Sequence, residues 1–159
     1  MHSRLQHEIK QRIPFASLQE EVFLSALRTA DCLLAGEVAV LREAGLTFAQ
    51  YNVLRILRGA LPGGLSCREI SDRMVTQDSD LTRLLDRLET AGFVTRKRDP
   101  QDRRVILPRI TRKGVAVLDG LDKPVARVHR DQLRHMTRQQ LETLAELLAT
   151  ARQGVPLKE

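Results

Sequence analysis

The sequence predicts a mainly α-helical fold that carries one small two-stranded β hairpin, an α+β class in which helices form most of the chain. Three observations lead to this expectation. Aliphatic residues recur at helical spacing along most of the sequence. Helix-start signals precede several of these stretches. Two short extended segments, separated by a polar turn, lie between residues 93 and 110.

The composition is typical of one folded domain spanning residues 1–159. The chain is 42% hydrophobic and 29% charged, which is usual for a globular protein with a core of its own. Only 3% of the residues are aromatic, so we expect a core of Leu, Val, Ile and Ala. No apolar run approaches the roughly 20 residues that span a bilayer, and the first residues lack the apolar stretch of a signal peptide. We therefore expect a cytoplasmic protein with no membrane partner.

Four helix starts carry the spacing of a capping box, in which a Ser or Thr and a Glu or Gln three residues later each accept a backbone hydrogen bond. The pairs are Ser17 with Glu20, Thr47 with Gln50, Ser66 with Glu69, and Thr137 with Gln140. Each pair precedes apolar residues at helical spacing, so each predicts the beginning of a helix.

The first three predicted helices follow from these starts. The first spans about residues 18–44, with an apolar stripe from Leu18 to Leu41, and it stops at Gly45. A single small domain would not cover a helix of this length. The second spans about residues 48–58 and ends before the loop LPGG. A short third helix is expected at residues 67–74.

A polar turn then leads into a helix that begins at Ser79 or Asp80 and ends near Ala91, with leucines along one face. The extended segments at residues 93–98 and 104–110 form the hairpin, and Pro108 marks the second as an edge strand. A long helix at about 111–135, kinked at Pro124, and a last helix at 138–152 complete the chain.

Between residues 46 and 113 the expected order is helix, helix, turn, helix and hairpin, as in a winged helix-turn-helix unit. In such units the helix after the turn enters the major groove of DNA, where side chains contact base edges. The candidate contact residues in and before this helix are Gln77, Asp78, Ser79, Asp80, Thr82, Arg83, Asp86 and Arg87. The same residues also suit an ordinary solvated helix face with ion pairs, such as Asp80 with Arg83.

The positive charge of the chain is concentrated in the hairpin. Between residues 93 and 113, eight basic and two acidic residues leave a net charge of +6, equal to that of the whole chain. The basic residues are Arg96, Lys97, Arg98, Arg103, Arg104, Arg109, Arg112 and Lys113. Neutralisation of phosphates supplies most non-specific DNA affinity, although charge also protects edge strands from pairing. Together, the helix and the hairpin favour duplex DNA as the partner.

The segments LTFAQYNVLRIL (46–57) and LTRLLDRLETAGFVTRKRDPQDRRVILPRITRKG (81–114) resemble the MarR family of bacterial regulators, and with the flanking helices the resemblance covers nearly the whole chain. It implies a homodimer in which residues 15–45 and 114–153 interdigitate with a second copy. It also places a wing-tip aspartate at Asp102 and a minor-groove arginine at Arg104, beside Arg103. With Arg96 and Arg98 these are the candidate wing residues. The acidic stretch TQDSDL (76–81) departs from the family pattern.

The resemblance further implies a small aromatic or anionic effector, whose identity and pocket residues the sequence does not give. Phe23, Phe48 and Tyr51 could line such a pocket, but we interpret them as core. Cys32 is interpreted as a buried, inert residue, whereas Cys67 lies in the first turn of a helix, where a thiolate is favoured. The histidines lack metal-ligand spacing, so we expect neither a metal nor another cofactor. No nucleophile elbow or phosphate loop indicates an enzyme.

The sequence therefore predicts a dimeric, ligand-responsive repressor that binds a pseudo-palindromic operator, with a recognition helix in the major groove and a basic wing in the minor groove. Two alternatives stay open. One is a winged-helix protein-interaction scaffold without specific DNA contacts, and the other is a regulator that senses oxidants through cysteine.

Overall fold

The structure is a computed structural model that describes residues 4–76, 80–98 and 106–154. Its helices are α1 (Arg4–Glu8), α2 (Leu18–Glu43), α3 (Phe48–Gly59), α4 (Cys67–Arg73), α5 (Leu81–Thr90), α6 (Arg112–Leu133) and α7 (Arg138–Gln153), and its strands are β1 (Val94–Arg98) and β2 (Ile106–Ile110). The predicted fold class, mainly helical with one antiparallel hairpin, is confirmed.

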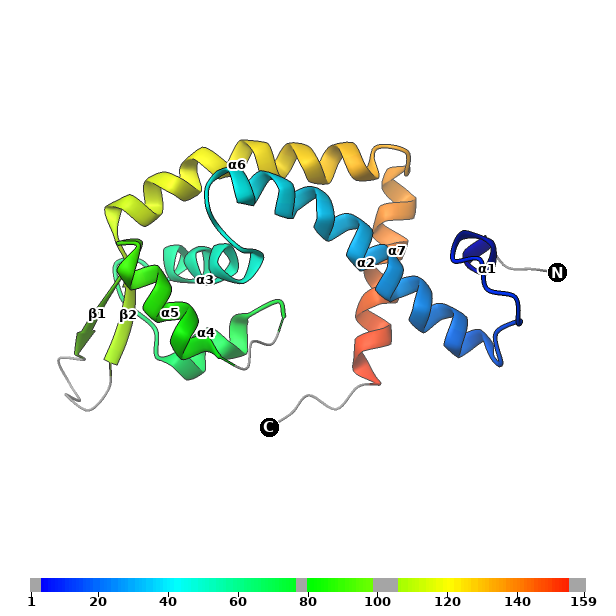
Figure 1. Ribbon diagram of the computed structural model, residues 1–159, viewed down its shortest axis with the longest axis horizontal. Helices are drawn as coiled ribbons and strands as arrows, with labels where there is room; N and C mark the ends of the chain where they lie inside the picture. The colour runs from blue at the N-terminus through cyan, green and yellow to red at the C-terminus, as the bar shows by residue number, and fades with distance from the viewer. Residues whose placement is uncertain (1–3, 77–79, 99–105, 155–159) are drawn as a thin grey trace.

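The molecule is elongated, with different elements gathered at its two ends (Figure 1). At one end α3, α4, α5 and the hairpin lie together, and the other end holds α1, the first half of α2 and α7. The long helices α2 and α6 run beside each other between these ends and pack together. We call the end with α3, α4, α5 and the hairpin the winged end, since these elements lie in the predicted winged unit (46–113); the predicted dimerisation segments, 15–45 and 114–153, extend from this end to the other.

Three of the four predicted capping boxes form in full, at Thr47, Ser66 and Thr137. At the fourth, Ser17 accepts a hydrogen bond from the backbone N–H of Glu20, but the Glu20 carboxylate accepts from the N–H of Ala16. The helix of residues 81–90 is capped by Asp80, whose carboxylate accepts from the N–H of Arg83 at 3.3 Å. Helix α1 escaped prediction because its sequence, RLQHE, contains a single aliphatic residue and shows no stripe.

The hydrophobic core lies in the winged end, where the last turn of α2 and the first half of α6 meet α3, α5 and the hairpin. Its largest fully buried side chains are Leu41, Val53, Leu54, Leu57, Ile70, Leu85, Leu88, Pro108 and Leu118. Gly114 permits the close approach of α6 to the hairpin, because a Cβ there would lie 2.5 Å from the carbonyl oxygen of Phe93. The first turn of α6 therefore packs directly against both sides of the hairpin's base, at Phe93 and Ile110.

The apolar stripe of α2, a helix longer than a single small domain would cover, is largely exposed in the described chain. Leu41 is the one α2 residue that is buried, whereas Leu18, Phe23 and Leu27 are 71%, 62% and 54% exposed. Helix α7 has no buried residue among those described. The interpretation of Phe23 as core is wrong for the single chain, because most of its surface is exposed to water.

An ion-pair cluster ties α3 to α6 beside this core. The guanidinium of Arg58 donates to both carboxylate oxygens of Asp122, at 2.9 and 2.8 Å, and to Asp119 at 3.2 Å. These hydrogen bonds hold the pKa of Asp122 below its ordinary value, against the smaller opposing effect of burial. The two-oxygen geometry makes this pair stronger than a typical surface ion pair.

We expect Asp122→Asn to lower the free energy of unfolding by about 1 kcal/mol at pH 7, because the pair is ordered but partly exposed. A carboxylate whose pKa is lowered by folding stabilises the protein above its unfolded pKa of about 3.9, and this contribution is lost as the pH falls through the folded value. Urea unfolding should therefore show a difference between wild type and variant that shrinks towards pH 3. Asp131→Asn, which breaks an exposed pair with Arg127, serves as the control and should leave stability nearly unchanged.

Candidate nucleic-acid interface

The helix pair α4 and α5 is held against α3 by buried aliphatic residues and one buried amide. Ile70 of α4 and Leu85 and Leu88 of α5 are fully buried. The side chain of Asn52, in α3, accepts a hydrogen bond from the backbone N–H of Val75 at 2.9 Å. This bond fixes the chain just before the turn that leads into α5, so that the position of α5 depends on α3.

The outward face of α5 carries Thr82, Arg83, Asp86 and Arg87, all exposed as predicted. Arg83 pairs with Asp80 across the first turn, at 3.2 Å, and its side chain remains 78% exposed. The Arg87 side chain makes no ion pair or hydrogen bond with the described residues. The face therefore offers two accessible guanidinium groups next to a small hydroxyl, which suits contacts with bases and phosphates.

Arg96 of β1 joins the hairpin to α5. Its Nη1 lies 2.6 Å from the carboxylate of Asp86 and 2.9 Å from that of Glu89, and its backbone N–H donates to Glu89 at 3.2 Å. The side chain is only 25% exposed. The structure thus places Arg96, predicted as a wing contact, against the recognition helix. Sequence reasoning missed Glu89, although its spacing three residues after Asp86 puts both carboxylates on one side of the helix.

A second cation, Lys113, makes its contacts within the protein, at the end of α5. Lys113 donates to the carbonyl of Ala91 at 2.7 Å and lies 4.9 Å from the centre of the Phe93 ring. Thr111 donates to the carbonyl of Gly92 at 2.7 Å. These contacts satisfy carbonyl groups at the end of α5 and connect it to the root of the hairpin. Part of the hairpin's positive charge therefore holds the unit together.

The hairpin pairs Val94 with Ile110 and Arg98 with Ile106, and Pro108 stands opposite Arg96. Among the described residues no third strand joins the outer side of β2, where the N–H of Leu65 donates to the carbonyl of Pro108 at 3.3 Å, so the missing N–H of Pro108 is tolerated. Arg98 and Lys97 are exposed. Six of the predicted contact residues lie outside the described residues, namely Gln77, Asp78, Ser79, Asp102, Arg103 and Arg104.

The acidic residues of α5 and its cap lie in ion pairs within the protein, although Asp86 and Glu89 share the single cation of Arg96. Asp80 pairs with Arg83, and Asp86 pairs with Arg96. An unpaired carboxylate on this face would repel DNA phosphates, whereas an ion pair presents no net charge. Of the acidic stretch TQDSDL (76–81), Asp80 is paired in this way, whereas Asp78 lies outside the described residues.

A cavity of about 320 Å³ lies between α2, the start of α3, the end of α6 and the segment that follows α4. Its lining residues are Ala30, Leu33, Leu34, Glu37, Phe48, Val75, Thr76, His129, Gln132 and Leu133. Of the three aromatic candidates, Phe48 lines this cavity and Tyr51 is buried in the core. The cavity adjoins Val75, the residue that Asn52 holds.

Both cysteines are exposed, so the interpretation of Cys32 as a buried residue is wrong for the single chain. Among the residues that the structure describes, no group of three His, Cys, Asp or Glu side chains could hold a metal ion. The described helices also include none that is long and apolar enough to cross a membrane.

Comparisons with known sequences agree with this architecture. The model of the MarR family matches residues 44–105. The chain is 30% identical to the multiple antibiotic resistance protein MarR of Salmonella typhimurium over 65% of this chain and 71% of that protein. It is 33% identical to the transcriptional regulator TtmR of Methylorubrum extorquens over 67% of this chain, and it spans 53% of that relative's length. It spans 65% of the length of YfiV, a regulator of Bacillus subtilis.

Solved structures show the same fold. A MarR transcription factor from Planctomyces limnophilus is 38% identical, with a TM-score of 0.65 over 86% of this chain and 98% of that one. BpsR of Bordetella bronchiseptica, whose DNA binding is regulated by 6-hydroxynicotinic acid, is 20% identical, with a TM-score of 0.78 over 90% of this chain and 100% of that one. The fold places the chain in the class of winged-helix proteins, and these relatives are transcriptional regulators rather than enzymes. The chain belongs to the MarR family.

The contacts of Arg96 predict an energetic coupling between the hairpin and α5. In a double-mutant cycle of Arg96→Met and Glu89→Gln, we expect a coupling energy of about 1 kcal/mol in urea unfolding, because the pair is partly buried and well oriented. Lys97→Met, on the exposed neighbour, should show no coupling to Glu89→Gln. A coupling near zero for Arg96 would contradict the positioning role.

Proposed function

We propose that the protein is a homodimeric repressor that binds a pseudo-palindromic operator, with α5 in the major groove and the hairpin over the minor groove. The observation that carries this proposal is the exposed polar face of α5 beside a basic hairpin, the two joined by Arg96 into one unit. A helix of this size fits the major groove, and its first turns lie nearest to the bases. We place this activity in the cytoplasm, where the DNA is accessible.

The roles of the candidate residues differ. Thr82, Arg83 and Arg87 are the described residues proposed to contact bases or phosphates, since they are exposed on one face of α5. Gln77, Asp78 and Ser79 stay proposed contacts just before this helix, as do Arg98, Arg103 and Arg104 in the wing, with Asp102 orienting an arginine. Asp80 and Asp86 are proposed to position Arg83 and Arg96 through their ion pairs.

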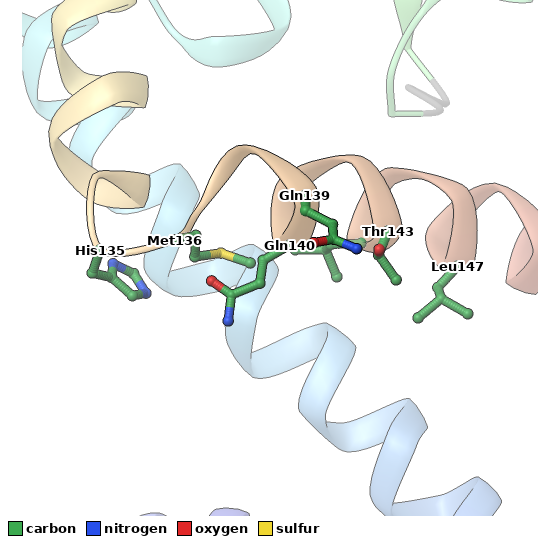
Figure 2. Close-up of a pocket in the computed structure, with 7 residues that line it drawn as sticks. His135, Met136, Gln139, Gln140, Thr143 and Leu147 are labelled. Atoms are coloured by element: carbon green, nitrogen blue, oxygen red, sulfur yellow. The ribbon is translucent and has the colours of Figure 1, made fainter.

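The homodimer is supported by apolar side chains that the single chain leaves uncovered. They gather in and beside α1, in the first half of α2 and in α7, and they include Ile9, Ile13, Leu18, Val22, Phe23, Leu27, Leu147 and Leu148. Water-exposed apolar surface of this extent favours association. A groove of about 510 Å³ opens along the start of α7, where Met136, Gln140 and Leu147 lie (Figure 2). We propose that a second copy covers these surfaces.

We propose that a small effector binds in the cavity beside Val75 and changes the affinity of the protein for DNA. This cavity lies between the two ends of the molecule and adjoins the segment that leads to α5. A ligand there would change DNA affinity by the difference in its own affinity for the two states. The regulation of BpsR by 6-hydroxynicotinic acid supports a response of this kind.

DNA binding is tested by selecting bound duplexes from a random pool and measuring affinity by fluorescence anisotropy at increasing salt. If six to ten phosphates are contacted, affinity should fall by about 10³–10⁵ between about 50 and 200 mM salt. Arg87→Ala and Arg104→Ala should each weaken binding by about 1–3 kcal/mol. Lys123→Ala, on the exposed surface of α6, is the matched control. Salt-independent binding, or unchanged affinity in Arg104→Ala, would instead favour a protein-interaction scaffold.

The dimer is tested by sedimentation of variants in which a charge replaces an exposed apolar residue. Phe23→Asp or Leu27→Glu should raise the dissociation constant of the dimer by roughly two orders of magnitude, because each substitution acts in both copies. Leu61→Glu, at a 50% exposed position in the winged end, should leave it unchanged. A wild-type protein that sediments as a monomer at about 1 µM would refute the proposed dimer.

A further inference from the structure

The cavity beside Val75 has one strongly polar wall, and that wall is acidic. The side chain of Glu37 is only 12% exposed, and its Oε2 lies 3.0 Å from Nε2 of His129. Its Oε1 accepts no hydrogen bond from the described residues. A carboxylate withdrawn from water in this way gains most from a ligand that donates a hydrogen bond or carries a positive charge.

The other polar groups around the cavity add acceptors rather than cations. No Lys or Arg occurs among its described lining residues. The amide nitrogen of Gln132 is engaged with the backbone carbonyls of Leu33 and Cys32, at 2.9 and 3.4 Å. The Gln132 side chain therefore presents its carbonyl oxygen for further contacts. An anionic ligand would meet a carboxylate with a single histidine to offset it, so the electrostatics disfavour it.

The rest of the wall is apolar. Leu33, Leu34, Phe48, Val75 and Leu133 come from four separate segments of the chain. The volume of about 320 Å³ is at the lower end of the range for ligand sites. One aromatic ring with a short side arm fits this combination of size and lining.

We propose that the cavity selects small molecules with an apolar ring and a protonated amine, and that it discriminates against carboxylate anions of the same shape. The amine would lie against Oε1 of Glu37, with the ring between Phe48 and the leucines. This proposal rests on the proposed effector site and specifies its ligand class. The proposed ligand class, an amine, differs from the acid that regulates the DNA binding of BpsR.

The same position gives the ligand a route to the recognition helix. Val75 and Thr76 line the cavity and lie within five residues of Asp80, the N-cap of α5. The N–H of Val75 is bonded to Asn52. A ligand ring that contacts Val75 therefore acts on the segment that leads into α5. Asn52, a residue of α3, bonds this segment to α3.

The experiment uses three probes of matched shape, namely 2-phenylethylamine, phenylacetate and 2-phenylethanol, titrated into the full chain by calorimetry. The amine should bind at least about tenfold more tightly than phenylacetate, as expected for a cation beside a poorly solvated carboxylate. In Glu37→Gln this preference should fall to about twofold or less. Glu43→Gln, at an exposed position on the same helix, should keep the wild-type preference.

DNA binding is measured in parallel on the operator selected above, without ligand. If the wild type binds DNA but phenylacetate binds as tightly as the amine, or the amine fails to bind at about 1 mM, the ligand class is wrong while the proposed function stands. If Glu37→Gln keeps the amine preference, Glu37 is not its source and the proposal is overturned. If the amine preference is present but no DNA is bound, the proposed function fails and the ligand class stands.

Discussion

The winged end depends on the burial of leucines where α3, α5 and the adjoining ends of α2 and α6 meet. Leu54, Leu85, Leu88 and Leu118 are fully buried there. Each comes from a different turn or helix, so that the same contacts that form the core also set the angle of α5. Replacing one such leucine by alanine typically costs about 2–5 kcal/mol, a large part of the stability of a small domain. The burial of these leucines therefore both stabilises the fold and sets the position of α5.

Electrostatics then divide the basic residues of the hairpin into two groups. Arg96 and Lys113 contact α5 and its C-terminal end, whereas Arg98 and Lys97 are exposed to solvent. The first group orients the hairpin, and the second remains available to a polyanion. The acidic residues at α5 take part in the same arrangement, because Asp86 and Glu89 share Arg96 and Asp80 pairs with Arg83. The net charge available to DNA is consequently smaller than a count along the sequence suggests, and it lies nearer to the hairpin's outer end.

The long helices α2 and α6 extend from the hydrophobic core towards the exposed apolar surface at the other end of the molecule. The ends of α2 and α6 towards the hairpin are buried, as Leu41 and Leu118 show, while Phe23 at the opposite end of α2 is exposed. One helix thus belongs to the core of a single chain and also presents a surface for association. The cavity with Glu37 and His129 lies between these regions, where a small displacement of α2 against α6 would be felt at both ends. This arrangement supports the proposal that occupancy of the cavity is coupled to the spacing of the two copies of α5 in the proposed dimer.

Local sequence determined most of the elements of this protein. Capping boxes at Thr47, Ser66 and Thr137 located helix starts, and leucine spacing identified the buried face of α5, because these signals act within one or two turns of backbone. Tertiary structure alone decided that Arg96 turns inward to Glu89, that Glu37 meets His129 across 92 residues of chain, and that the stripe of α2 is uncovered. Such contacts join segments that are distant in sequence, and only the packing of the helices sets which side chains come within reach of each other.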